Sequence, residues 1–354
     1  MVDHPSNVGS AGVINEFGII LAMSTTTDEE RLYLGTQAGL LVLALRNDGW
    51  QRGEVLWRDR SVLALAVDPF LPRRLHAVVE NDGLYRSEDG GRSWERYLAG
   101  DFQVLGLRPD RPEIVYAGGE PPEIYRSTDS GGRWTAMQLS GQRDRPTDTT
   151  CPPWRVRALV FDPARRASLY VGVEGGGLVR TFDGGREWIA LTARGLPIEI
   201  KSLLPMPEPT RALFAGTAKG LYCSLDEGFT WTTDGIGMAE PEVLALASTS
   251  EGLLAAAHPR GADDQAWGTL PARLYRRPTG SARWWQVSEP LDGAVHGFAT
   301  HSDGIRVYAG TTGGTVWSSQ DAGLSWRPIA RGLPPIHGLT LDARGDGRPA
   351  DEAG

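Results

Sequence analysis

The sequence predicts an all-β protein folded as a seven-bladed β-propeller, in which each blade is a four-stranded antiparallel sheet. One observation is a repeat: the same pattern recurs about every 40 to 50 residues, a period typical of propellers and solenoids. The other is the content of each copy, which holds four short β-prone apolar runs separated by Gly, Pro or Asp. Four such runs form one meander, and seven meanders packed radially bury both faces of every sheet.

The repeat is clearest between Val62 and Tyr97. It contains Val-x-Ala-Leu, a Pro-containing turn, Leu-Tyr-Ala-Gly, a Gly turn, Leu-Tyr-Arg-Ser and finally Asp-x-Gly-x-x-Trp. Copies start at Val62, Val104, Val156, Ile200, Val243 and Val295, and a weaker one begins near Ile19. A linear β-solenoid is the structural alternative, but its rungs are shorter and lack a four-strand rhythm.

Two segments are candidates to complete the first blade and so close the ring. One is the N-terminal IILAMS, from Ile19, and the other is IHGLTLD, Ile336–Asp342. The sequence leaves open which of them does so. We expect a propeller over residues 13–342, with disordered tails at 1–12 and 343–354, because the tails are polar and rich in small residues.

Composition excludes several classes of function. A formal net charge of −8, with no dense Lys/Arg run, argues against a nucleic-acid partner. The N-terminus lacks the pattern of a signal peptide, and no apolar run is long enough to cross a membrane, so we expect a cytoplasmic protein without membrane insertion. Cys151 and Cys223 fall in different repeats and different contexts, so no disulfide framework is expected.

Five copies end in the motif Ser/Thr-x-Asp-x-Gly-x-x-Trp. We expect these turns to be structural: the hydroxyl and the carboxylate bond backbone N–H groups of a tight turn, Gly supplies positive φ, and Trp caps the apolar layer between sheets. The copy that starts at Val243 keeps only Trp284, and the first copy keeps only Trp50. The five aspartates are Asp89, Asp129, Asp183, Asp226 and Asp321.

These turns resemble the Asp-box (BNR) repeats of a propeller superfamily. Its members include sialidases, sortilin-type ectodomains, xyloglucan-degrading endoglucanases and the propeller assembly factor of photosystem II. The resemblance extends from about Ile19 to Asp342. In that superfamily the Asp box is structural, so the resemblance implies a fold and no particular activity.

The catalytic sets of the superfamily are not matched in this sequence. A sialidase needs an early Phe/Tyr-Arg-Ile-Pro segment, which the sequence lacks. The xyloglucanases use two facing propellers and are about twice as long as this chain. The photosystem factor is normally exported, whereas this sequence lacks the pattern of a signal peptide. The chain resembles bacterial single-propeller proteins of this group that carry sialidase-like names without the catalytic set.

Strand direction predicts where a binding site would lie. The loops that join strands two and three of each blade share one face, the top face, with the connections between blades, and propeller pockets usually open there. Both long insertions fall on this face, at Leu139–Trp154 and at His258–Ala272. Long loops on a rigid scaffold are where binding residues concentrate, although elaboration without function is also common.

Aligning the repeats places polar residues around the expected channel mouth. The ends of the second strands align Gln37, Glu80, Glu120, Glu174, Ala218, His258 and Thr312. The starts of the innermost strands align Leu63, Leu105, Arg157, Lys201, Leu244, His296 and His337, with Arg155 two residues before Arg157. We expect cationic and histidine side chains to face the three glutamates across the channel mouth.

This rim suggests several kinds of chemistry. Candidate catalytic residues are Glu80, Glu120 and Glu174, since carboxylates serve as acids, bases or nucleophiles. Candidate ligand-binding residues are Arg155, Arg157, Lys201, His258, His296 and His337, with Trp154 and Trp267 as stacking platforms in the long loops. The alternative is a wet channel whose polar groups only solvate one another. No cofactor is expected, and a metal site made by the three histidines has no supporting spacing.

Three hypotheses for function follow. The first is a non-enzymatic binding or scaffold propeller that engages a small anionic or carbohydrate-like ligand, or a protein partner, through its top face. The second is a glycoside hydrolase or lyase, which would need two carboxylates about 5 to 10 Å apart beside a cavity. The third is an assembly factor for a membrane protein complex. The sequence leaves open whether the protein is an enzyme.

Overall fold

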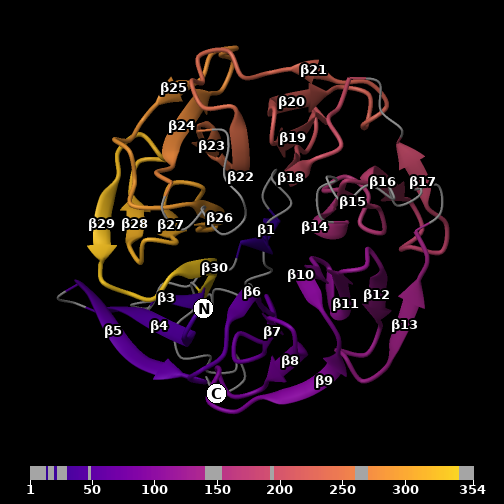
Figure 1. Cartoon of the computed structure of the whole chain (residues 1–354), viewed down its shortest axis with the longest axis vertical. Coiled ribbons are helices and arrows are strands. Elements are labelled where there is room, and N and C mark those ends of the chain that lie inside the picture. Colours follow the sequence, from indigo (N-terminus) through magenta and orange to yellow (C-terminus); the bar gives the residue numbers. More distant parts are fainter. Residues whose placement is uncertain are drawn as a thin grey trace, which may run out of the picture.

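The predicted seven-bladed β-propeller is confirmed. In this computed structural model, seven four-stranded antiparallel sheets stand around a common axis (Figure 1). The structure describes residues 30–46, 49–139, 154–191, 195–259 and 270–342, together with the backbone of 13–14 and 20–21. Within these stretches there is no helix. The two predicted tails and most of both long insertions lie outside the described residues.

In blades 2 to 7 the strands follow the chain from the axis outward, whereas in blade 1 the innermost strand comes from the C-terminal part of the chain. Blade 1 consists of β30 (Ile336–Asp342), β3 (Arg31–Thr36), β4 (Gly39–Arg46) and β5 (Gly49–Leu56). Blade 2 consists of β6 (Val62–Val67), β7 (Leu75–Val79), β8 (Gly83–Ser87) and β9 (Glu95–Ala99). Blade 3 consists of β10 (Phe102–Arg108), β11 (Arg111–Gly119), β12 (Ile124–Ser127) and β13 (Trp134–Met137). Blade 4 consists of β14 (Arg155–Phe161), β15 (Leu169–Glu174), β16 (Gly177–Thr181) and β17 (Ile189–Leu191). Blade 5 consists of β18 (Ile200–Pro205), β19 (Leu213–Thr217), β20 (Gly220–Ser224) and β21 (Thr232–Thr233). Blade 6 consists of β22 (Glu242–Thr249), β23 (Gly252–His258), β24 (Arg273–Pro278) and β25 (Trp285–Gln286). Blade 7 consists of β26 (Val295–Thr300), β27 (Val307–Thr311), β28 (Val316–Ser319) and β29 (Arg327–Ala330).

The ring is closed by the C-terminal candidate strand. β30 is the innermost strand of blade 1 and pairs antiparallel with β3, so that Leu341 lies opposite Leu32 and Leu339 opposite Leu34. The N-terminal candidate contributes β2 (Ile20–Leu21), which pairs only with β1 (Val13–Ile14) in a separate two-stranded sheet. Blade 1 therefore joins the two ends of the described chain, as Figure 1 shows by the yellow β30 beside the indigo β3.

The second strand of each blade is buried because neighbouring blades cover both of its faces. In β7 and β19 every residue is buried, which explains why these strands are runs of apolar and small residues rather than alternating patterns. The glycine of the Leu-Tyr-Ala-Gly segment allows a close approach between blades. A Cβ on Gly118 would lie 2.6 Å from the Val156 side chain, and one on Gly172 would lie 2.7 Å from Ile200. The repeated glycine thus sets the spacing between blades.

The five turns with the Ser/Thr-x-Asp-x-Gly-x-x-Trp motif, here called the aspartate turns, share the hydrogen bonds of their hydroxyl and carboxylate groups, and four of the five also share the bond from the Trp indole. In blade 2, Ser87 Oγ accepts from Gly91 N at 2.8 Å and donates to Asp89 Oδ1 at 2.8 Å. Asp89 Oδ1 also accepts from Ser93 N at 2.9 Å, and Trp94 Nε1 donates to Gly91 O at 2.9 Å. Partial burial alone would raise the pKa of Asp89, but the hydrogen bonds from Ser93, Ser87 and Arg92 outweigh it and lower the pKa to about 2. These turns lie on the bottom face, opposite the top face defined above.

Candidate functional site

A β-bulge at the same place in every innermost strand builds the channel mouth. In blade 2, Val62 pairs with Val79 and Ala64 with Val78, so that Leu63 is an extra residue without a partner in the ladder. Each bulged residue follows a buried one, and all seven line a cavity of about 290 Å³ on the propeller axis. The seven bulged residues are Leu63, Gln103, Arg157, Lys201, Leu244, His296 and His337. A bulge re-aims one side chain and leaves the rest of the strand in register.

One of these residues differs from the sequence alignment. In blade 3 the bulged residue is Gln103, because Phe102 pairs with Gly119 and Val104 with Gly118. The alignment placed Leu105 there, but Leu105 pairs with Ala117 and packs in the core with Phe102. The error arose because Phe102 replaces the usual Val or Ile at the start of the strand, which made Val104 the apparent start.

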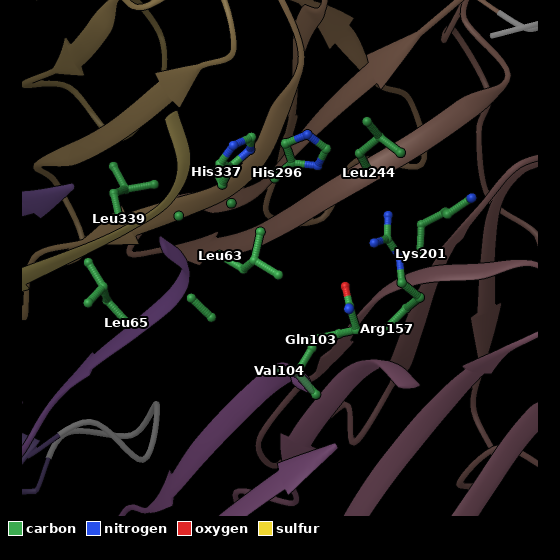
Figure 2. A pocket seen from close by; sticks show the side chains of 13 residues that line it. Leu63, Leu65, Gln103, Val104, Arg157, Lys201, Leu244, His296, His337 and Leu339 are labelled. Atoms are coloured by element: carbon green, nitrogen blue, oxygen red, sulfur yellow. The ribbon is translucent and has the colours of Figure 1, made fainter. Parts of the chain in front are cut away.

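Polar and apolar groups divide the cavity. Figure 2 shows the imidazoles of His296 and His337 next to each other, on the other side of the cavity from Gln103 and Arg157. Lys201 comes from the strand that follows Arg157 around the ring. Leucines supply the apolar lining, from Leu63, Leu65, Leu244 and Leu339. The described lining contains no Asp or Glu side chain.

A buried carboxylate supports the cationic side of this cavity. The side chain of Glu174 is 2% exposed and accepts a hydrogen bond from Arg155 Nε at 3.0 Å. Arg157 Nε lies 3.6 Å from Glu174 Oε2, and Lys201 Nζ is bonded to Glu174 Oε1. Glu242 Oε1 lies 4.0 Å from Lys201 Nζ. Among the described residues, this cluster combines three cations with two carboxylates, those of Glu174 and Glu242.

The other two candidate glutamates have different surroundings. Glu80 and Glu120 occupy the same register position as Glu174, each directly after the partner of a buried residue in the innermost strand. Both are exposed, whereas Glu174 is buried. Neither lines the cavity, although Glu80 is close enough to His337 to act on its charge. The described structure therefore brings the cations and two histidines together, and leaves the carboxylates outside the cavity lining.

The three rim histidines are neutral at physiological pH. Burial, and then the positive charge of Arg157, lower the pKa of His296 to about 3. Burial lowers the pKa of His337, with a partial offset from Glu80, and lowers the pKa of His258 to about 4. Neutral imidazoles can both donate and accept hydrogen bonds, so they complement the fixed charge of Arg157 and Lys201.

Two other predicted rim residues lie just outside the cavity. His258 ends β23 and is buried, and its Nε2 has no hydrogen-bond partner among the described residues. Trp154 packs in the core between blades 3 and 4, and its buried Nε1 also lacks a described partner. Trp267 lies outside the described residues.

Acid should destabilise the protein through histidines that are buried in the fold. His76 and His258 are buried, with pKa values lowered to about 3 and about 4, so between these values and pH 6.5 only the unfolded chain binds the protons. The free energy of unfolding should therefore decrease as the pH is lowered, by about 1.4 kcal/mol per histidine between pH 7.5 and pH 5.5. Urea unfolding at the two pH values measures this loss.

A matched variant distinguishes this cause from general acid effects. His76→Gln removes one titrating group beside Tyr97, whose hydroxyl contacts His76 Nδ1 at 3.0 Å. The variant should lose less stability than the parent over the same pH interval. Equal losses in both proteins would contradict the assignment to His76.

Metal and membrane features were also sought in the structure. Within the described residues no three His, Cys, Asp or Glu side chains are arranged to hold a metal ion. No helix in the described part of the chain is long and apolar enough to cross a membrane.

No family model matches the sequence. A probable oligoxyloglucan-reducing end-specific xyloglucanase from Neosartorya fischeri is 25% identical over 171 residues, which cover 43% of this chain and 20% of that enzyme. The match thus spans about a fifth of the relative's length.

Solved structures resemble the chain in fold. An ancestral GH74 enzyme matches with a TM-score of 0.58 at 14% identity, over 79% of this chain and 38% of that one. YCF48 bound to D1 peptide matches with a TM-score of 0.52 at 19% identity, over 87% of both chains. U3-55K matches with a TM-score of 0.60 at 11% identity, over 88% of both. The chain is a seven-bladed β-propeller. At these identities the likeness shows the fold alone, and the matched propellers include both hydrolases and binding proteins.

Proposed function

We propose that this protein is a binding propeller whose channel mouth holds a small anionic ligand. The observation that carries the proposal is the lining of the axial cavity: Arg157 and Lys201 face neutral His296 and His337, and no described carboxylate lines it. A carboxylate or phosphate group placed there would meet a guanidinium and an ammonium group in a partly desolvated site, where charge-assisted hydrogen bonds are strong.

Glu174 supports this proposal as a positioning residue. Its carboxylate, buried beneath three cations, fixes their side chains in place before a ligand arrives. Preorganised donors of this kind reduce the entropy lost on binding.

Glycoside hydrolysis is the second candidate, favoured by the sequence match to the xyloglucanase and by the GH74 likeness. Such chemistry needs a pair of carboxyl groups that flank the bond to be cleaved. Glu174 is engaged by Arg155 and Lys201, and Glu80 and Glu120 are exposed away from the cavity lining. Release of reducing sugar from xyloglucan oligosaccharides, lost in Glu80→Gln and Glu120→Gln, would support this candidate over ligand binding.

Assembly of a membrane complex is the third candidate, and it rests on the likeness to YCF48 over most of both chains. It predicts that the chain co-purifies with subunits of a membrane complex. If the chain associates stably with such subunits and replacement of Arg157 does not weaken the association, the binding surface lies elsewhere than the channel mouth.

The ligand proposal is tested by comparing glucuronate with glucose, which has the same ring without the carboxylate. Glucuronate should raise the unfolding temperature, and at about 100 times its Kd it should add about 2.7 kcal/mol to the free energy of unfolding. Arg157→Met should remove this stabilisation. The measurement is thermal unfolding with increasing ligand, followed by isothermal titration calorimetry.

A control variant is available on β10. Arg108→Met removes a cation of similar exposure that pairs with Asp110 at 2.8 Å and does not line the cavity. It should leave glucuronate stabilisation unchanged. Equal stabilisation by glucose, or unchanged stabilisation in Arg157→Met, would contradict the proposal.

A further inference from the structure

A second cavity lies on the bottom face, where blade 6 lacks an aspartate turn. Strand register shows what replaces the motif: Leu75 pairs with Ser87 in blade 2, and the equivalent Leu253 pairs with Arg277 in blade 6. Arg277 thus occupies the position of the motif hydroxyl. Counting forward, Ser281 occupies the position of the motif glycine, and Trp284 remains in place of the motif tryptophan.

In other blades the motif glycine closes the gap to the preceding blade. A Cβ on Gly185 would lie 2.5 Å from Met137 Sδ, and one on Gly228 would lie 2.8 Å from Leu191. Met137 and Leu191 occupy equivalent positions, because they pair with Ile124 and Leu178 respectively. At these two junctions an apolar residue of the outer strand therefore packs against the next aspartate turn.

Both partners of this contact are replaced between blades 5 and 6. The residue opposite Leu221, equivalent to Leu178, is Asp234, whose N donates to Leu221 O at 2.9 Å. Asp234 thus stands where Met137 and Leu191 stand elsewhere. Its carboxylate forms an ion pair with Arg277, and the two side chains are 14% and 17% exposed. An apolar contact between blades has become a half-buried ion pair.

The space that the turn would fill is open. It is a cavity of about 570 Å³, within the range of small-molecule sites. Met206, Phe214, Leu225 and Leu253 supply apolar walls, and the Cys223 thiol also lines it. A Cβ on Gly280, in the replaced turn, would meet nothing within 4 Å, whereas one on the equivalent Gly184 would lie 3.2 Å from Tyr116 Oη.

The ion pair is suited to an uncharged polar group. The Arg277 guanidinium carbon lies 4.8 Å from the ring centroid of Phe214 and 5.4 Å from that of Trp284, so cation–π contacts with both rings help to hold it in place. Among the described residues, Arg277 donates one hydrogen bond, from Nη1 to Asp234 Oδ2. The edge of the pair therefore offers donors beside an acceptor, and it has no net charge. Such a pair costs desolvation energy where an apolar contact would not.

We propose that this cavity binds a small molecule with a flat apolar body and an uncharged head that carries a donor beside an acceptor, the class of aromatic carboxamides. The body packs against Phe214 and Leu253. The head accepts from Arg277 and donates to Asp234. The site is independent of the channel mouth, because no residue lines both cavities.

The probe is naphthalene-2-carboxamide, with naphthalene-2-carboxylate and naphthalene as matched ligands. Isothermal titration calorimetry and saturation-transfer NMR should give a Kd at least about tenfold lower for the carboxamide, since each comparison ligand loses a hydrogen bond to a charged group. Absence of saturable carboxamide binding would overturn the proposal.

Two variants locate the binding. Thr233→Trp introduces a bulky ring at an exposed residue that lines the cavity, and Ala136→Trp makes the equivalent change beside an intact aspartate turn in blade 4. Thr233→Trp should weaken carboxamide binding at least about tenfold, because the new ring should displace at least one contact of the ligand. Ala136→Trp should leave carboxamide binding unchanged. Equal effects of the two variants would show that binding occurs elsewhere.

A double variant tests whether the ion pair recognises the carboxamide group of the ligand, separately from its effect on folding. Asp234→Leu with Arg277→Met restores an apolar contact like that of Leu191, so its unfolding midpoint should be no lower than that of the parent. It should still bind naphthalene but should no longer prefer the carboxamide. A preference that survives in this folded variant would refute the assigned role of the ion pair.

Discussion

Removing residues 336–354 is expected to abolish cooperative folding. β30 supplies the hydrogen-bond partners on the inner side of β3, and its Ile336 is buried in the same core as Leu32 and Leu34. β30 also packs against β26 and β6, the innermost strands of both neighbouring blades. Its loss opens the ring and exposes a central strand as an edge, which should cost a large part of the roughly 5 to 15 kcal/mol that stabilises a typical domain.

Circular dichroism and urea unfolding of the shortened chain measure this effect. The matched control removes only residues 343–354, which follow β30, and should retain the parent transition. A point variant, Ile336→Asp, places a charge at a buried position of β30 without shortening the chain and should also be severely destabilised. A cooperative transition of parental midpoint in the chain without β30 would show that the ring closes in another way.

Glu174→Gln should destabilise the protein by about 3 to 5 kcal/mol, the usual cost of removing one partner from a buried ion pair. The change keeps the shape of the side chain but removes the charge that Arg155, Arg157 and Lys201 share. These cations would then repel one another in a partly desolvated cluster, in which Glu242 is the carboxylate that remains among the described residues. Urea unfolding at neutral pH measures the loss.

A surface glutamate provides the control. Glu88 also pairs with two arginines, Arg74 and Arg86, but its side chain is 52% exposed. Glu88→Gln should therefore cost less than about 1 kcal/mol, because solvent screens such pairs. Equal losses in the two variants would indicate that burial of Glu174 adds nothing to its interactions.

Sequence alone predicts the architecture because its determinants are local and repeated. The motif hydroxyl, aspartate and glycine act within one turn, so each copy reports its own structure, as in Ser87, Asp89 and Gly91. Ring closure was left open because IILAMS and Ile336–Asp342 have the same pattern, and only pairing with β3 distinguishes them.

The candidate site was predictable only in part. Alignment placed Arg157, Lys201, His296 and His337 at one level of the channel, where they line one cavity. It missed Gln103, since a bulge in a strand with an unusual first residue shifts the apparent register by two. It also gave no sign of the cavity at Arg277, because that site depends on a residue of the preceding blade, Asp234, far away in the chain.

The bulges of the innermost strands separate the chemistry of the pore from the stability of the scaffold. At each blade the residue that faces the axis has no place in the hydrogen-bond ladder, while its buried neighbour holds the blades together, as Arg157 and Val156 illustrate. These seven positions carry leucine, glutamine, arginine, lysine or histidine, although Leu63 and Leu244 also pack against buried side chains. The seven bulged positions are therefore suitable sites for combinatorial libraries, in which the side chains at these positions would determine the ligand specificity of each variant.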